Sequence, residues 1–155
     1  METWVPILFI ILAVAMAVGP VLMLKPSKRQ QGIAKLRARA LDMNLQVHML
    51  PLSKGRLSVP AYCRPWREKG ADKAVWVLER MAYQHDLHFY KEWAWQADLV
   101  AAPQWHARLN ELLPQIPQQL LAIGSGPQGL CCFWDERGGE PVLEEIAAIL
   151  EKLNG

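Results

Sequence analysis

Residues 4–24 form the feature that most limits what this chain can fold into, because 21 consecutive positions carry no charged side chain. At 1.5 Å per residue, a helix of that length reaches about 30 Å, which is the thickness of the hydrocarbon core of a bilayer. Pro6 falls in the expected first turn, where its missing N–H costs nothing, whereas Gly19-Pro20 predicts a kink. We therefore predict a transmembrane anchor over residues 1–25.

The charges on either side of this segment predict its orientation. A cleaved signal peptide would begin with positive charges and have a shorter apolar core, but the only charged side chain before the segment is that of Glu2. Positive charges stay on the cytoplasmic side of a membrane. We therefore expect a single-pass protein of a bacterial inner membrane, with its N-terminus outside and its C-terminal domain in the cytoplasm. Six basic residues and no acidic one follow within positions 25–41: Lys25, Lys28, Arg29, Lys35, Arg37 and Arg39.

Residues 26–44 predict a basic juxtamembrane helix that continues the anchor. Its apolar positions fall along one side, at Ile33, Leu36, Ala40 and Leu41. The six cations are candidates for binding anionic lipid headgroups, at about 1 kcal/mol for each cation near the surface. The alternative is that these charges only determine the topology of the anchor.

The transition from anchor to basic helix resembles a known family. Leu24-Lys25-Pro26-Ser27-Lys28-Arg29-Gln30, followed by a basic helix, resembles the opening of YajC-type proteins, which are small accessory subunits of the preprotein translocase. In that family a single span precedes a similar Pro-Gln-Lys-Arg run and a small β-rich cytoplasmic domain. Residues 45–57 lack the Gly-rich β segment of the family. The resemblance covers only the anchor and the basic helix. It implies a single span with a cytoplasmic domain and an accessory role.

The charge of the remaining chain argues against one class of partner. After position 42 there are 11 Lys or Arg residues and 13 Asp or Glu residues, so the basic character is confined to the edge of the membrane. A nucleic-acid-binding domain carries a broad positive face. We expect no nucleic acid among the partners.

Residues 45–155 predict one α+β domain. The expected order begins with a strand at residues 45–49, a long ordered loop at 52–72 and a hairpin of 74–82 with 87–96. A helix at 103–113, a second hairpin of 120–123 with 130–134 and a final amphipathic helix at 141–153 follow. On the second arm of the first hairpin, Leu87, Phe89, Trp93 and Trp95 share one face. This order predicts a small antiparallel sheet covered on one face by two helices.

Several motifs suggest chemistry, but a structural explanation is favoured for each. The sequence from Gly124 to Gly129 matches G-x-G-x-x-G, yet a strand and not a helix follows it, so we predict a hairpin turn. His85 and His88 supply at most two metal ligands. No serine lies in a nucleophile elbow, and no acid pair suggests general acid–base catalysis. We predict no enzyme and no cofactor.

The chain has three cysteines, an odd number: Cys63, Cys131 and Cys132. A disulfide between the adjacent pair would be strained. This pattern favours reduced thiols in a reducing compartment. Because residues 130–134 read as a strand, one thiol of the adjacent pair should face the core and the other the opposite face.

Six of the seven tryptophans lie in the domain, and one of them lies in a segment rich in proline and arginine. Trp and Arg are enriched at protein interfaces. The candidate partner-binding residues are Tyr62, Arg64, Trp66 and Arg67. We predict a non-catalytic accessory subunit or assembly factor that binds a larger membrane protein complex. The alternatives are a membrane-tethered binding module for a small ligand or a lipid headgroup, and a YajC-like translocase accessory protein.

Overall fold

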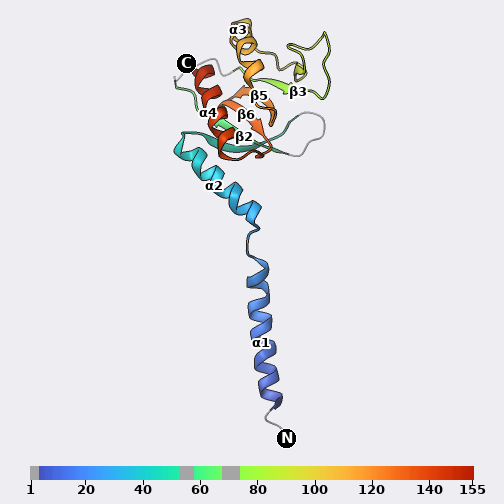
Figure 1. Cartoon of the computed structure of the whole chain (residues 1–155), viewed down its shortest axis with the longest axis vertical. Helices are drawn as coiled ribbons and strands as arrows, with labels where there is room; N and C mark the ends of the chain where they lie inside the picture. Colours follow the sequence, from blue (N-terminus) through green and yellow to red (C-terminus); the bar gives the residue numbers. More distant parts are fainter. Residues whose placement is uncertain (1–3, 53–57, 68–73) are drawn as a thin grey trace. The chain divides into compact units, whose positions relative to one another are not determined.

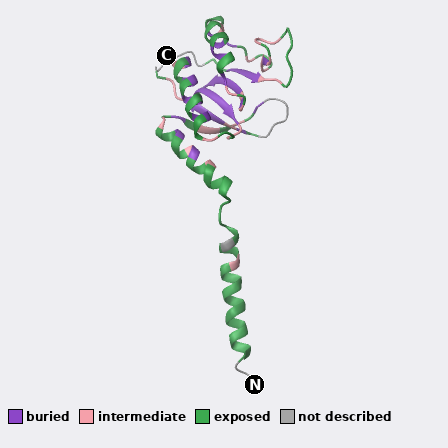
Figure 2. Cartoon of the chain, viewed as in Figure 1, coloured by how far each residue is buried: buried purple, intermediate pink, exposed green. Residues whose placement is uncertain are grey.

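The computed structural model describes residues 4–52, 58–67 and 74–155. The chain forms two compact units, residues 1–34 and 35–155. In the first unit, helix α1 (Trp4–Met23) is apolar along its length, and Pro20 lies inside it. Its Trp4–Val21 window has a mean hydropathy of 2.4 and no buried residue (Figure 2). This one helix is long and apolar enough to cross a membrane.

The chain breaks between the anchor and the basic helix, so the prediction of one continuous helix is wrong. α1 and α2 (Lys28–Asp42) are two separate helices (Figure 1). A reciprocal pair of hydrogen bonds between Ser27 and Gln30 starts α2. The backbone N–H of Ser27 donates to Gln30 Oε1 over 2.8 Å, and the Gln30 N–H donates to Ser27 Oγ over 3.2 Å. This S-x-x-Q arrangement is a capping box, which starts a new helix by satisfying its free N–H groups.

The second unit contains a six-stranded antiparallel sheet, which confirms the α+β class. Its strand order is β1-β2-β6-β5-β3-β4. The strands are β1 (Gln46–Leu50), β2 (Val59–Arg64), β3 (Trp76–Arg80), β4 (Trp93–Trp95), β5 (Leu120–Gly126) and β6 (Gly129–Trp134). The remaining helices are α3 (Pro103–Leu112), the 3-10 turn η1 (Leu113–Gln115) and α4 (Glu140–Asn154).

The second predicted hairpin is confirmed, and with it the interpretation of the Gly-rich motif. β5 and β6 pair up to Gly126 and Gly129, so Pro127 and Gln128 form a tight turn. Gly129 has a φ of +119°, and a Cβ added there would lie 1.9 Å from the backbone oxygen of Arg64. Only glycine fits this position.

The first hairpin is confirmed only in part. β3 and β4 pair as expected, with Arg80 opposite Trp93, but β4 has three residues. Tyr90 and Trp93 exchange backbone hydrogen bonds of 3.1 and 2.7 Å around Lys91, whose φ is +48°. This tight turn precedes β4 and redirects the chain, so the strand begins only at Trp93. Leu87 is consequently 88% exposed and does not share a buried face with the tryptophans.

A strand lies where the sequence predicted a loop. β2 pairs with both β1 and β6, so part of the predicted loop over residues 52–72 is wrong. The loop was predicted because the segment contains prolines, Pro60 among them, which are typical of loops. Pro60 lies opposite Met49 on β1, before the pairing with β6 begins at Ala61, and a strand tolerates a missing N–H at such a margin. Residues 53–57 and 68–73 of that predicted loop lie outside the described part of the chain.

The main core lies between the sheet and its helices (Figure 2). Alternate strand residues point into it, among them Tyr62, Leu78 and Trp134. α4 supplies the apolar stripe that the sequence predicted, with Leu143, Ile146, Ala147, Leu150 and Leu153 all buried. Leu36 and Ala40 of α2 join the same core, so three helices and not two contribute to this layer.

Candidate functional site

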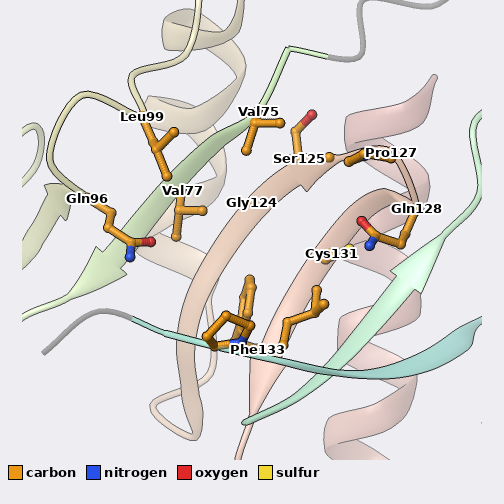
Figure 3. Close-up of a pocket in the computed structure, with 13 residues that line it drawn as sticks. Val75, Val77, Gln96, Leu99, Gly124, Ser125, Pro127, Gln128, Cys131 and Phe133 are labelled. Atoms are coloured by element: carbon orange, nitrogen blue, oxygen red, sulfur yellow. The ribbon is translucent and has the colours of Figure 1, made fainter. Parts of the chain in front are cut away.

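The opposite face of the sheet is hollowed into a groove of about 270 Å³ (Figure 3). We call it the sheet groove. It is built by segments far apart in the sequence: the end of β1, strands β3, β5 and β6, the β5–β6 turn and the segment after β4. Its main apolar side chains are those of Leu50, Val75, Val77, Leu99 and Phe133, and its polar side chains are those of Gln96, Ser125 and Gln128.

A disulfide between Cys63 and Cys131 lies at the sheet groove, so the expectation of reduced cysteines is wrong for this pair. The two residues lie opposite each other on β2 and β6, which brings their sulfur atoms together. Cys132 points to the other face and is a buried free thiol, as the alternation predicted. Burial raises the pKa of the Cys132 thiol. It therefore behaves as a small apolar side chain.

The four predicted partner-binding residues lie close along the chain, but they do not form one exposed surface. Tyr62 has no exposed area, and its hydroxyl donates to Glu136 Oε1 over 2.9 Å. The indole N–H of Trp66 donates to the Gly126 carbonyl oxygen over 3.0 Å, and its ring packs on that of Trp105. These two aromatic side chains are held by the domain itself.

The two arginines of that set share an acidic partner on α4. Arg64 pairs with Glu151 over 2.8 Å, and its side chain is only 14% exposed. Arg67 pairs with the same carboxylate, and its side chain is 57% exposed. Of the four predicted residues, Arg67 offers the most area to a partner.

Of the six cations predicted to bind headgroups, two form ion pairs within the described part of the chain and four do not. Arg37 makes two hydrogen bonds to Glu136, of 2.7 and 3.0 Å, so its charge is used inside the domain. Arg39 pairs with Glu140 over 3.1 Å at the surface. The remaining cations are exposed and form no ion pair with any described residue: Lys25, Lys28, Arg29 and Lys35.

Arg37, Glu136 and Tyr62 form a network that the sequence did not reveal. The side chain of Glu136 is 6% exposed, and its backbone φ of +61° is unusual for a residue other than glycine. Hydrogen bonding to Glu136 raises the pKa of the Arg37 guanidinium. Burial, together with the hydrogen bond to Glu136, raises the pKa of the Tyr62 hydroxyl. The network therefore holds a buried charge with three hydrogen bonds.

The histidines of the β3–β4 connection have local structural roles. His85 Nδ1 accepts the backbone N–H of Leu87 over 3.0 Å, and His88 Nδ1 lies 2.8 Å from the carbonyl oxygen of Lys91. Within residues 4–52, 58–67 and 74–155, no group of three or more His, Cys, Asp or Glu side chains is placed to hold a metal ion.

No protein-family model, curated protein or solved structure matches the chain. Its class is therefore defined by what it contains, which is an apolar helix long enough to span a membrane, a capped basic helix, and an α+β domain with an apolar groove on one sheet face.

Proposed function

We propose that this chain is a non-catalytic, single-pass accessory subunit or assembly factor of a bacterial inner membrane, and that it binds a larger membrane protein complex. The observation that supports this most is the division of the chain into an exposed apolar helix and a domain with its own core. Such a chain can tether a binding surface at a membrane. The resemblance of the anchor and the basic helix to YajC-type proteins agrees with an accessory role.

We place the domain on the cytoplasmic side. Six cations follow the span and only Glu2 precedes it, and positive charges near a span resist translocation. The Cys63–Cys131 bond is an argument for the opposite side, because disulfides persist in oxidising compartments. We base the orientation on the cations and not on the disulfide, because positive charges determine the orientation of a span while it is inserted into the membrane. Two thiols held opposite each other by strand pairing can be joined or reduced without unpairing the strands.

The exposed cations supply a second membrane contact. Lys25, Lys28, Arg29 and Lys35 lie close after the span, where each cation gains about 1 kcal/mol from an anionic leaflet. Arg37 contributes less to this contact because Glu136 neutralises it. We therefore propose that anionic lipid headgroups are bound by these four residues.

Purification of the tagged full-length chain in a mild detergent tests the proposed function. We expect stoichiometric co-purification with the subunits of one membrane complex. A chain that purifies alone at every detergent concentration would contradict the accessory role.

Two matched arginine variants test where the complex is bound. Arg67→Ala should lower the recovery of the complex, whereas Arg137→Ala should not, although both side chains are exposed (57% and 77%) and both form surface ion pairs. Such pairs contribute about 0–1 kcal/mol, so neither variant should change the melting temperature appreciably. Equal recovery with both variants would remove Arg67 from the docking surface. Trp66→Ala is less suitable because its indole is hydrogen-bonded within the domain.

A further inference from the structure

The described lining of the sheet groove contains no charged side chain, although it draws on segments far apart in the sequence. Its walls are formed mainly by Leu50, Val75, Val77 and Leu99, with Phe133 on β6 (Figure 3). A charged ligand placed against this lining would lose its hydration without gaining an ionic partner, which is costly. The groove therefore selects against ions.

Two amide side chains in the lining of the groove are available for polar contacts with a ligand. Gln96 and Gln128 lie on opposite sides of the groove in Figure 3, and neither side-chain amide makes a hydrogen bond to another described residue. Ser125 is different, because its hydroxyl already donates to the Ala74 carbonyl oxygen over 2.8 Å. The two glutamines can each donate and accept, so they suit a neutral polar group.

The walls of the groove are held in place before any ligand arrives. The Gln96 N–H donates to the Val77 carbonyl oxygen over 2.9 Å, and the Val77 N–H donates to the Leu99 carbonyl oxygen over 3.1 Å. These bonds fix the segment after β4 to β3. On the other side, the Cys63–Cys131 bond joins β2 to β6. A preformed site loses less conformational entropy when a ligand binds.

From these observations we propose that the sheet groove is a binding site for an uncharged, largely apolar small molecule that fits about 270 Å³ and carries a neutral hydrogen-bonding group. The apolar walls supply the free energy of binding by burying apolar surface, and the two glutamine amides orient the neutral group. This site is independent of the proposed accessory role, because neither Arg67 nor the exposed cations line it.

Two probes that differ by a single charged group test the ligand class. N-phenyl-1-naphthylamine is neutral, and 8-anilino-1-naphthalenesulfonate adds a sulfonate to the same rings. Each is added to the full-length chain in lipid nanodiscs, and amide hydrogen exchange is read by mass spectrometry, which reports on the protein whatever amount of probe enters the lipid. We expect the neutral probe to slow exchange in peptides covering residues 74–79 and 124–133, and the anion to leave them unchanged. Equal protection by both probes, or none by the neutral one, would overturn the proposal.

A matched pair of variants tests the location of the site. Val75 lines the groove and is 48% exposed, whereas Val100 is 49% exposed and lies outside the lining. Both positions are open enough to accept a glutamate without disturbing the core. Val75→Glu should weaken binding of the neutral probe at least tenfold, and Val100→Glu should leave it unchanged. Binding unaffected by Val75→Glu would overturn the assignment, as would a polypeptide found to occupy and protect the groove in the purified protein.

Discussion

Arg37 on α2 and Glu136, 99 residues later in the chain, form a two-point ion pair with hydrogen bonds of 2.7 and 3.0 Å. Tyr62 adds a third hydrogen bond to the same carboxylate. The end of the basic helix is therefore bonded into the second unit through Arg37 and packed on its core through Leu36 and Ala40.

Removing this pair should destabilise the second unit. Arg37→Met keeps the length of the side chain but leaves the Glu136 carboxylate, which is 6% exposed, without its charged partner. We expect a loss of about 2 kcal/mol in the free energy of unfolding, the typical value for hydrogen bonds to a charged group, because the Arg37 side chain is itself 40% exposed. Denaturant unfolding of the full-length chain in detergent, followed by tryptophan fluorescence, measures it.

Arg39→Met is the control for this experiment. Arg39 pairs with Glu140 where both side chains are at least half exposed (50% and 59%), so its loss should cost less than about 1 kcal/mol. Equal effects of the two variants would show that the buried carboxylate has no special dependence on Arg37.

The β5–β6 turn should tolerate a side chain at one glycine and not at the other. A Cβ at Gly129 would lie 1.9 Å from the Arg64 carbonyl oxygen, and the φ of Gly129 is +119°. Gly129→Ala should therefore cost more than about 1 kcal/mol, because the backbone itself must move. At Gly126 the nearest atom is the flexible Gln128 Oε1, at 3.1 Å, so Gly126→Ala should cost much less. Melting temperatures of the two variants compare these costs, and a more damaging Gly126→Ala would contradict the structure of the turn.

Cys132 should make the domain less stable in alkali. Burial raises the pKa of its thiol in the folded state above the ordinary value of 9.0, so the folded chain keeps a proton that the unfolded chain loses. Stability is then fully present below about pH 9 and falls as the pH rises, by up to about 1.4 kcal/mol for each pH unit. Between about pH 9 and pH 10 the unfolding free energy of Cys132→Ala should change less than that of the native chain. Parallel slopes would show that Cys132 does not titrate on unfolding.

The disulfide should stabilise the domain measurably. Cys63 and Cys131 are separated by 68 positions, and a native disulfide typically stabilises a fold by about 2–4 kcal/mol. A thiol reductant should therefore lower the unfolding free energy of the native chain by that amount. It should have no effect on the Cys63→Ala/Cys131→Ala double variant. A reductant effect of the same size in both chains would assign the loss to something other than this bond.

Local patterns predicted much of this fold, because they depend on neighbouring residues. The periodicity of α4, the helix predicted over residues 103–113 and the turn between β5 and β6 were all readable from the sequence and are confirmed. The break before α2 was readable too, because Pro26 and the Ser27–Gln30 capping box precede it, but the basic pattern alone suggested a continuous helix.

The groove and the disulfide could not be predicted, because both depend on the pairing of distant strands. Cys63 meets Cys131 only when β2 lies beside β6, and β2 falls in a segment whose Pro60 argued against any strand. The groove likewise gathers Leu50, Gln96 and Gln128 from segments that carry no shared motif. The types of these residues do not indicate which strands will pair or in which register.

We place the second unit on the cytoplasmic side of the membrane, and a reporter joined after Gly155 measures that placement directly. Alkaline phosphatase is active only after export, whereas green fluorescent protein, exported unfolded through the general secretory pathway, fluoresces only when it stays in the cytoplasm. We expect the green fluorescent protein fusion to fluoresce and the phosphatase fusion to be inactive, because the cations at positions 25–39 resist translocation. An active phosphatase with a dark fluorescent fusion would contradict the cytoplasmic placement, and it would place the Cys63–Cys131 bond in the oxidising compartment where such bonds persist.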